Sequence, residues 1–432
     1  MQQTLAIIVG GGPAPGINGV ICAATIEAVN KGLKVIGIMD GFKWLFRGNT
    51  KKIIRLTGKN VWNIHNRGGS LLRTARDFPD NLEEKLENAV KAIKALKIKF
   101  LITIGGDGTA YIATEIKKRA GRSLSIVHVP KTIDNDLPLP GGVPTFGFET
   151  ARHWGTEIVE NIIVDARTAG RWYFVTTMGR HTGHLALGIG KASGATITLI
   201  PEEFKEKKLK FTKVADVLEG SIIKRLSRGY PHGVALLAEG VAGKIDVKSL
   251  YEHIEKVEAA SESSRNDLRS NQLNSDPLRD RKGVLKFSEI KLGRVLEHFV
   301  SKSLESRGIK TRIIHKNIGY ELRAANPIPF DAEYTRNLGY SAVKFLLKGR
   351  TGAMITFFED KVKPVPFKKI IDPATKKTRL RYVDIKSEPY RVGRKYMIRL
   401  EKEDFSPGKI AKLARVGRMS VDEFRNRFSY LV

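Results

Sequence analysis

Two segments of similar design constrain this chain more than any other feature, because each is a short apolar run that ends abruptly in glycine, hydroxyl and carboxylate groups. The first, Leu101–Thr109, reads LITIGGDGT, and the second ends in Pro130–Asp136, PKTIDND. Short apolar runs that stop in this way are typical of buried strands in a parallel sheet. In such sheets, ligands bind at the carboxyl ends of the strands. The sequence therefore predicts a binding site where these two strands end.

Strand-like and helix-like segments alternate along the first third of the chain. A buried-strand run at 4–9 ends in the glycine-rich segment 10–16 and continues as a helical pattern over 17–29. A second strand follows at 35–39, and apolar residues return at helical spacing between 82 and 96. This alternation predicts right-handed βαβ units around a mostly parallel sheet.

A second group of strand-like runs follows a long helical stretch at 148–164. These runs are 171–180, 195–200, 233–239 and 312–323. We therefore expect an α/β fold with two doubly wound, mostly parallel domains, an active site in the cleft between them and a C-terminal extension. The expected parts are a first α/β domain at 1–150, a second α/β domain at 151–318 with a mobile insertion at about 259–283, and a return to the first domain with the extension at 319–432.

The residue types at the two strand ends favour phosphoryl transfer. Glycines allow the backbone to approach a phosphate closely, and free N–H groups can bind it. A carboxylate such as Asp107 would repel a phosphate, so its presence implies a metal ion between them. Asp134 is then a candidate general base, and Asp136 could orient it or help to hold the metal. An Asx-rich turn that caps a helix is the structural alternative.

The composition is that of a cytosolic enzyme. The chain has 432 residues, 41% of them apolar, and a single cysteine, Cys22, which excludes an internal disulfide and favours a reducing compartment. The first strand-like run begins at Thr4, so we expect no secretory signal before it. No apolar run approaches the roughly 20 residues of a membrane span. We expect a cytoplasmic protein with no membrane partner.

The charge balance is unusually basic, with a net charge of +30. Such a surface can bind nucleic-acid phosphates, or it can steer small anions towards a cleft. The densest basic runs, 205–213 and 361–381, lack the regular aromatic residues of a base-stacking surface. We therefore expect no specific nucleic acid partner, and a basic nucleic-acid-binding protein on a kinase-like scaffold is the distant alternative.

Six motifs together resemble those of the phosphofructokinase family. In chain order they are GGPAPG at 11–16, GGDGT at 105–109, PKTIDND at 130–136, MGR at 178–180, AEG at 238–240 and GYELR at 319–323. The resemblance runs from about residue 4 to residue 340, and the branch of short pyrophosphate-using enzymes is the most similar. It implies Mg²⁺-dependent transfer of a phosphoryl group to the 1-hydroxyl of fructose 6-phosphate, in glycolysis, by a homotetramer or homodimer.

The resemblance also implies roles for individual residues. Asp134 would take the hydroxyl proton, Arg180 and Lys131 would be further catalytic residues, and Asp107 would hold Mg²⁺. The sugar phosphate would be bound by Thr132, Ile133, Asp134, Asp136, Arg171, Met178, Gly179, Arg180, Glu239, Tyr320, Glu321, Leu322 and Arg323, with Arg171 reaching a neighbouring subunit's site. The donor pocket would be formed by Gly11, Gly12, Arg76, Asp77, Gly106, Asp107, Gly108 and Thr109.

The phosphoryl donor depends on one position within the resemblance. Pyrophosphate enzymes typically carry Asp where this chain has Gly108, which leaves room for the α-phosphate of ATP. Lys131 occurs in pyrophosphate enzymes and also in some ATP enzymes. We therefore expect fructose 6-phosphate and ATP as substrates, with Mg²⁺ as cofactor, and pyrophosphate as the alternative donor. NAD kinases and lipid kinases share the GGDG turn but lack the TIDND and MGR motifs.

Overall fold

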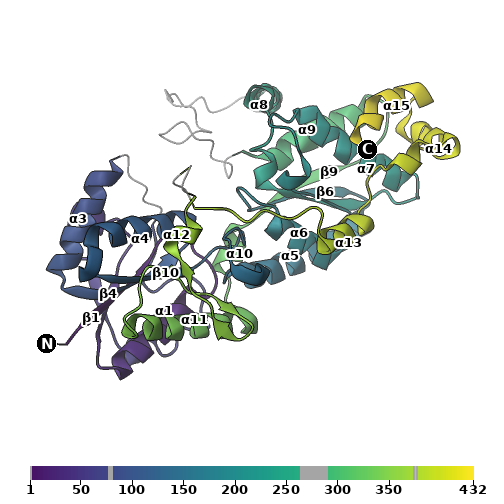
Figure 1. The fold of residues 1–432 in the computed structure, drawn as a ribbon. Coiled ribbons are helices and arrows are strands. Elements are labelled where there is room, and N and C mark those ends of the chain that lie inside the picture. The colour runs from purple at the N-terminus through teal and green to yellow at the C-terminus, as the bar shows by residue number, and fades with distance from the viewer. Residues whose placement is uncertain (1, 76–80, 263–289, 373–374, 376–377) are drawn as a thin grey trace. The chain divides into compact units, whose positions relative to one another are not determined.

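The computed structural model describes residues 2–75, 81–262, 290–372, 375 and 378–432 (Figure 1). The chain forms two compact units. Unit 1 comprises residues 1–154 and 320–381, and unit 2 comprises residues 155–319 and 382–432. The sequence predicts one return segment at 319–432, whereas the structure divides that segment after Arg381.

Unit 1 is built around a seven-stranded sheet with the order β13-β10-β5-β4-β1-β2-β3. Its strands are β1 (Thr4–Val9), β2 (Lys34–Ile38), β3 (Ile53–Leu56), β4 (Ile98–Gly105), β5 (Ser125–Pro130), β10 (Ala353–Met354) and β13 (Val365–Pro366). The pairs β1–β2, β1–β4, β4–β5 and β5–β10 are parallel, and the outer pairs β2–β3 and β10–β13 are antiparallel. A separate antiparallel pair joins β11 (Phe357–Phe358) to β12 (Lys361–Val362).

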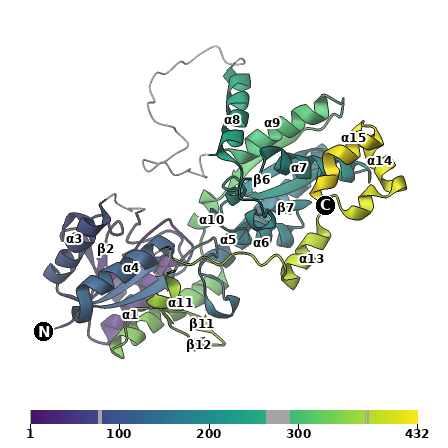
Figure 2. The ribbon, with the colours of Figure 1, turned by 45° about the horizontal axis from the view of Figure 1, so that its top comes forward.

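Helices cover both faces of this sheet, so β1 contributes to two cores. Leu5, Ile7 and Val9 pack with α1 and α11, whereas Ala6 and Ile8 pack with α3 and α4, as the period of two in a strand requires. Figure 2 shows α4 and α1 on opposite faces. The helices of unit 1 are α1 (Ile17–Asn30), α2 (Gly58–Val61), α3 (Leu82–Ala95), α4 (Asp107–Ala120), α10 (Tyr320–Ala324), α11 (Pro329–Leu347) and α12 (Phe367–Ile370), and α5 (Phe148–Ala169) continues from unit 1 into unit 2.

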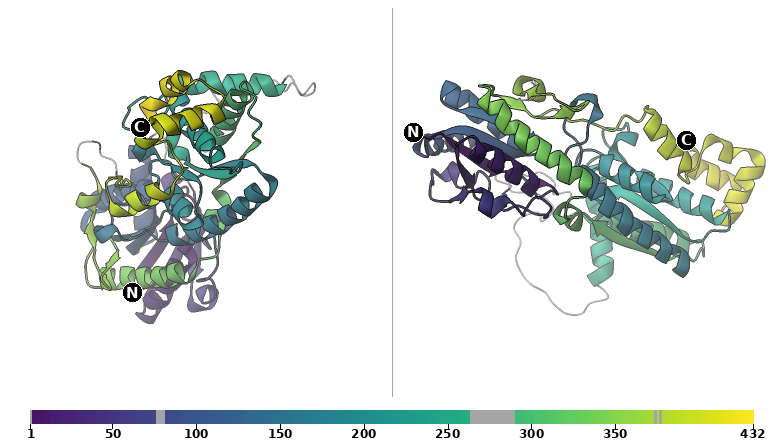
Figure 3. Two further views of the ribbon diagram at one scale, coloured as in Figure 1. Left: turned by 90° about the vertical axis from the view of Figure 1, so that its right-hand side faces the viewer. Right: turned by 90° about the horizontal axis from the view of Figure 1, so that it is seen from below.

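Unit 2 contains a four-stranded parallel sheet with the order β7-β8-β6-β9. Its strands are β6 (Trp172–Thr177), β7 (Ile197–Leu199), β8 (Gly233–Ala238) and β9 (Ile313–Ile318). Its further helices are α6 (His184–Ser193), α7 (Phe211–Leu226), α8 (Val247–Glu262), α9 (Leu292–Glu305), α13 (Glu388–Tyr396), α14 (Pro407–Gly417) and α15 (Val421–Phe428). Figure 3 shows the C-terminal helices α14 and α15 in yellow, beside the unit 2 helices they pack on.

The C-terminal helices complete the core of unit 2. Phe424 and Phe428 are fully buried and belong to the same apolar core as Trp172 and Phe174 of β6. Residues 382–432 are thus part of this unit's packing and not an appendage. Of the insertion expected at about 259–283, residues 259–262 lie in α8 and the rest lies outside the described residues.

The prediction of an α/β fold with mostly parallel sheets is confirmed. One local prediction is wrong, because the strand expected over 312–323 ends at Ile318 and α10 follows. Gly319 ends the strand against the side chain of Met178, and the helix places Leu322 in a fully buried position. In the described part of the chain, no helix has the length and apolar character needed to cross a membrane.

Candidate active site

The GGDG turn joins β4 to α4, and its glycines are required by close packing. Gly105 is the last residue of β4, Gly106 precedes the helix, and Asp107 is its first residue. A Cβ atom on Gly105 would collide with the side chain of Thr109, as would one on Gly10 at the end of β1. Thr109 is buried between these two strand ends, so the two glycine turns lie side by side. This brings the N-terminus of α4, which favours anions, next to the first glycine-rich segment.

Lys131 connects the two turns. Its backbone N–H donates to the carbonyl of Gly105 (2.8 Å), and its Nζ donates to the carbonyl of Gly12. Gly11 lies in the left-handed region (φ 83°), and a Cβ there would lie 3.3 Å from Nζ of Lys131. The lysine side chain is buried, so its cation is held at the base of both turns. Arg76 and Asp77, which the sequence also assigns to the donor pocket, lie outside the described residues.

His128 contacts the last strand residue of the GGDG turn through its imidazole ring. This residue was not identified from the sequence. Its Nε2 lies 3.0 Å from the carbonyl oxygen of Gly105, and its Nδ1 lies 2.9 Å from the hydroxyl oxygen of Thr103. Burial lowers the pKa of His128 to about 3, so the ring is neutral. A neutral ring can donate from Nε2 and accept at Nδ1. The only sequence signal was a polar residue within the apolar strand that precedes the PKTIDND motif.

The TIDND loop after β5 is tightly hydrogen-bonded. Thr132 Oγ1 accepts from the N–H of Asp134 (3.0 Å), and the Thr132 carbonyl accepts from the hydroxyl of Thr145 (2.7 Å). Asn135 adopts a left-handed conformation (φ 56°), and its Oδ1 accepts from the N–H of Thr145 (3.0 Å). The loop thus has a defined shape in which Ile133 and Asp136 are both buried.

Asp107, Asp134 and Asp136, termed here the site carboxylates, influence one another electrostatically. Asp136 is 8% exposed, and burial together with the charges of Asp134 and Asp107 raises its pKa to about 8. Like charges that share a poorly solvated region favour the retention of a proton. The structure therefore brings together the three carboxylates that the sequence singles out, at the ends of two adjacent parallel strands.

The GYELR motif also lies in unit 1, but as the short helix α10. The guanidinium of Arg323 lies 4.6 Å from the centre of the Tyr320 ring, which is a cation–π distance. Tyr320 is 60% exposed, whereas Leu322 is fully buried. The side chain of Leu322 therefore anchors the helix, while Tyr320, Glu321 and Arg323 belong to its accessible part.

The remaining predicted residues lie in unit 2, and the structure separates them into two groups. Met178, Gly179 and Arg180 follow the carboxyl end of β6, and Glu239 follows that of the neighbouring β8. The N–H of Gly240 donates to the carbonyl of Gly179 (3.1 Å), which joins the two strand ends.

Arg171 precedes β6 and therefore lies at the opposite end of the strand from Arg180. Its guanidinium binds both carboxylate oxygens of Asp165 (2.6–2.9 Å), and the Tyr173 hydroxyl donates to the same carboxylate (2.5 Å). Within unit 2, Arg171 is thus not part of the group formed by Met178, Arg180 and Glu239.

Residues 4–346 match the family model described as phosphofructokinase. The chain is 48% identical over 432 residues to the pyrophosphate–fructose 6-phosphate 1-phosphotransferase of Thermotoga maritima, covering 99% of this chain and 98% of the relative. It is 44% identical to the enzyme of the same name from Naegleria fowleri, covering 99% and 96%. An ATP-dependent 6-phosphofructokinase from Chloroflexus aggregans is 31% identical, covering 84% of this chain and 90% of the relative.

Solved structures are similar in fold. The crystal structure of a pyrophosphate-dependent phosphofructokinase from Marinobacter aquaeolei superposes with a TM-score of 0.66. It is 15% identical and covers 97% of this chain and 92% of its own. At this identity the likeness concerns the arrangement of helices and strands, which agrees with the two mostly parallel sheets described above.

Proposed function

The chain belongs to the phosphofructokinase family, and from this premise we propose that it transfers a phosphoryl group from pyrophosphate to the 1-hydroxyl of fructose 6-phosphate. It is a phosphotransferase with an alcohol acceptor. One observation carries the choice of donor, namely the 48% identity to a pyrophosphate enzyme along 99% of this chain. The family model ends at residue 346, so this similarity extends into the C-terminal region that packs in unit 2.

The proposed reaction begins with removal of a proton from the sugar hydroxyl by Asp134. General-base catalysis of this kind typically contributes about 10²–10⁴-fold to the rate. Burial and the charges of Asp134 and Asp107 raise the pKa of Asp136, which lies two residues from the proposed base. Lys131, held between the two glycine turns, would offset the charge of the donor phosphates as the leaving phosphate departs.

The residues present fit a divalent cation held together with the donor phosphates. No three His, Cys, Asp or Glu side chains in the described ranges are grouped so that they could hold a metal ion by themselves. Mg²⁺ commonly uses one or two protein carboxylates and completes its coordination with phosphate oxygens and water. Asp107, exposed at the first turn of α4, is the residue we propose as its ligand. The cation would supply charge neutralisation for the transferring group.

We propose the following residues as contacts of the sugar phosphate. Arg323, with Tyr320 and Glu321, would bind the 6-phosphate, because guanidinium groups form strong charge-assisted bonds to phosphate. Thr132, Ile133 and Asp136 of the TIDND loop would line the sugar site in unit 1. From unit 2 we assign Met178, Gly179, Arg180 and Glu239 to the substrate, and Arg171 to the 6-phosphate of a neighbouring subunit in a homodimer or homotetramer.

A donor panel tests the proposal. Purified enzyme with fructose 6-phosphate and Mg²⁺ is offered pyrophosphate, ATP, GTP and ADP, and initial rates give kcat/KM for each. We expect pyrophosphate to have the highest value and the reverse reaction, with phosphate and fructose 1,6-bisphosphate, to proceed. Activity with ATP and none with pyrophosphate would contradict the donor and leave the sugar-phosphate substrate in place.

ATP is the second candidate donor, and Gly108 is the observation that favours it. Without a Cβ at this position, no carboxylate repels the α-phosphate of ATP. Gly108→Asp separates the candidates, because a like charge at contact distance costs several kcal/mol in a partly desolvated site. If the wild type uses both donors, the variant should lose ATP activity and keep pyrophosphate activity. Equal losses with both donors would indicate a disturbed turn and not donor selection.

A further inference from the structure

Arg381, the last residue of unit 1, lies against the TIDND loop, and its guanidinium binds Asn135 of that loop and Val143 beyond it. Nε and Nη2 donate to the carbonyl of Asn135 (3.1 and 2.9 Å), and Nη1 donates to the carbonyl of Val143 (3.1 Å). Nη2 also donates to Oδ1 of Asn135. In addition, the backbone N–H of Arg381 donates to the carbonyl of Asp136 (2.7 Å).

The residue held by these bonds has an unusual conformation. Asn135 lies in the left-handed region (φ 56°), which costs energy for a residue with a Cβ unless surrounding contacts maintain it. Both its main-chain and side-chain oxygens are occupied, by Arg381 and by the N–H of Thr145. Asn135 separates Asp134 from Asp136, so the direction of the chain at both carboxylates depends on this one conformation.

Arg381 also brings a positive charge to the site carboxylates. Burial lowers the pKa of its guanidinium, and the charge of Asp136 acts in the opposite direction. An arginine stays protonated in such surroundings, so it favours the charged form of a nearby carboxylate. Its position at residue 381 lies beyond the segment matched by the family model, which ends at 346. The contact therefore comes from the segment of unit 1 that follows α11.

We propose that Arg381 is a positioning residue for the phosphoryl transfer: it maintains the left-handed conformation of Asn135 and thereby sets the geometry of Asp134 and Asp136. This proposal rests on the proposed function, since it assumes that Asp134 takes the proton from fructose 6-phosphate. The fork of the guanidinium is essential, because Nε and Nη2 bind the carbonyl of Asn135 while Nη1 binds that of Val143. A lysine would supply the charge without the fork.

The experiment compares Arg381→Ala and Arg381→Lys with Arg379→Ala. Arg379 is exposed, and among the described residues its backbone N–H donates to Ile370 while its side chain makes no hydrogen bond. It therefore controls for the loss of one positive charge from the same segment. Steady-state rates give kcat and KM for fructose 6-phosphate, and circular dichroism verifies folding. We expect Arg381→Ala to lower kcat by about 10²-fold with little change in KM, the effect of a misplaced catalytic group.

Two further readouts separate positioning from a merely structural role. Without the cation, the acidic limb of the pH profile of kcat should move to higher pH in Arg381→Ala and stay in place in Arg381→Lys. Arg381→Lys should nevertheless recover only part of the rate. Added guanidinium chloride, below denaturing concentrations, should raise the rate of Arg381→Ala and not that of Arg379→Ala.

The outcomes distinguish this proposal from the proposed function. If the wild-type enzyme fails to phosphorylate fructose 6-phosphate with every donor of the panel, the proposed function itself is overturned. An active wild type with unchanged kcat and an unmoved pH profile in Arg381→Ala overturns the role of Arg381. If Arg381→Ala fails to fold, Arg381→Lys carries the test, and a wild-type rate in that variant contradicts the need for the guanidinium fork.

Discussion

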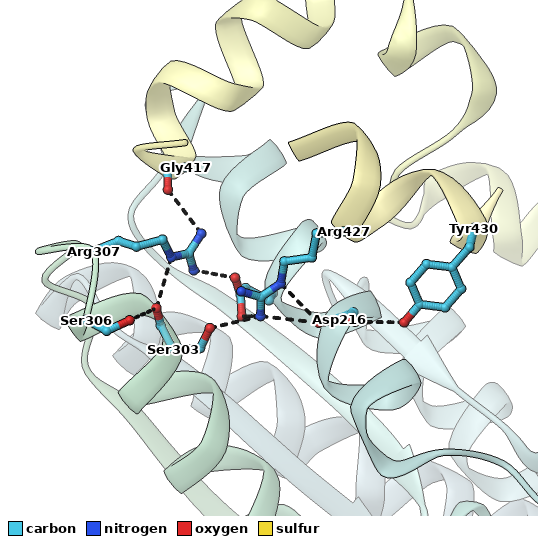
Figure 4. Close-up of polar contacts among 8 residues, drawn as sticks. Asp216, Ser303, Ser306, Arg307, Gly417, Arg427 and Tyr430 are labelled. Carbon is cyan, nitrogen blue, oxygen red and sulfur yellow. Dashed lines mark hydrogen bonds and ion pairs between the residues drawn. The ribbon is translucent and has the colours of Figure 1, made fainter. Parts of the chain in front are cut away.

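Buried carboxylates of the two units have neighbouring charges of opposite sign. In unit 2, Asp216 and Glu219 of α7 are matched by the arginine pair Arg307 and Arg427 (Figure 4). In unit 1, Asp136 is similarly buried, but the largest charges acting on it are those of two further carboxylates. Opposite charges in the first case link distant segments, whereas like charges in the second raise the free energy of the folded chain. The comparison agrees with the roles we propose, in which Asp216 and Glu219 serve structure and the site carboxylates serve chemistry.

The contacts of Arg307 and Arg427 show which segments these ion pairs hold together. Arg427 of α15 donates to Glu219 (2.7 Å) and to the hydroxyl of Ser303 on α9 (2.9 Å), while Arg307 pairs with Glu219 and donates to the carbonyl of Gly417 on α14 (3.0 Å). The Tyr430 hydroxyl donates to Asp216 (2.7 Å). Burial raises the pKa of Glu219, and the two arginines act against that rise. The C-terminal helices are thereby fastened to α7 and α9.

The largest effect is expected at the proposed general base. Asp134→Asn keeps the shape of the side chain and removes its ability to accept a proton, so turnover should fall by about 10²–10⁴-fold. Fructose 6-phosphate binding, measured by calorimetry, and the unfolding midpoint should stay close to wild type. A variant that keeps more than half of the wild-type turnover would remove Asp134 from this role and would weaken the functional side of the comparison.

Loss of an ion pair of Glu219 should have the reverse effect, lowering stability and leaving turnover unchanged. Arg307→Ala leaves Glu219, whose side chain is fully buried, with one of its two cations removed. Breaking a buried pair typically destabilises a protein by about 3–5 kcal/mol. Urea unfolding measures the loss, and hydrogen exchange should show it as faster exchange in α14 and α15 than in β1 and β4. Turnover per folded molecule should not change.

The control for this variant is Arg415→Ala, because Arg415 is exposed on α14. Surface substitutions of this kind usually change stability by less than about 0.5 kcal/mol. Equal effects of the two variants would show that the arginine pair contributes no more than an ordinary surface charge. In that case only the variants of the site carboxylates in unit 1 would support the distinction between structural and functional carboxylates.

How far the sequence predicts this molecule follows from the range of the interactions. The strand and helix at 4–9 and 17–29 were predictable because apolar periodicity is local, and the structure has them at Thr4–Val9 and Ile17–Asn30. The placement of the site carboxylates was predictable because they lie just beyond the carboxyl ends of two apolar strands. Donor selection was less accessible, since Gly108 favours ATP whereas similarity along the whole chain favours pyrophosphate.

Residues whose role depends on distant partners could not be read from the pattern. Arg381 binds Asn135 across 246 positions, and nothing in the basic run 361–381 marks one arginine as different from its neighbours. His128 lies within an apolar strand, and its function is visible only once Gly105 is placed beside it. Likewise, the assignment of residues 382–432 to unit 2 depends on Phe424 and Phe428 filling a core formed by residues far earlier in the chain.

A third variant tests a cation of unit 1 that we assign to substrate and not to stability. Arg323→Ala removes a charge-assisted contact to phosphate, typically worth about 1.5–3 kcal/mol, or roughly tenfold to a hundredfold in binding. KM for fructose 6-phosphate should therefore rise more than kcat falls. Arg350→Ala, at an exposed arginine of the same unit, is the control. An unchanged KM in Arg323→Ala would place the 6-phosphate elsewhere.

The smallest expected effect concerns Asp136 and is a change of stability with pH. The pKa of this carboxyl is about 8 in the folded chain and about 4 in an unfolded one, so the folded state binds the proton more tightly. Its contribution to stability is therefore present below about pH 4 and is lost as the pH rises towards 8. Asp136→Asn removes the ionisation, so the variant should match wild type at about pH 4.5 and exceed it by about 1–3 kcal/mol at about pH 8.5. Urea unfolding at the two pH values measures the difference.

The control is Asp216→Asn. This variant should destabilise the folded protein at both pH values, because the carboxylate of Asp216 is paired with Arg427 and Tyr430. If instead both variants lost stability equally at high pH, Asp136 would be a carboxylate paired like those of unit 2, and the contrast between the two units would fail.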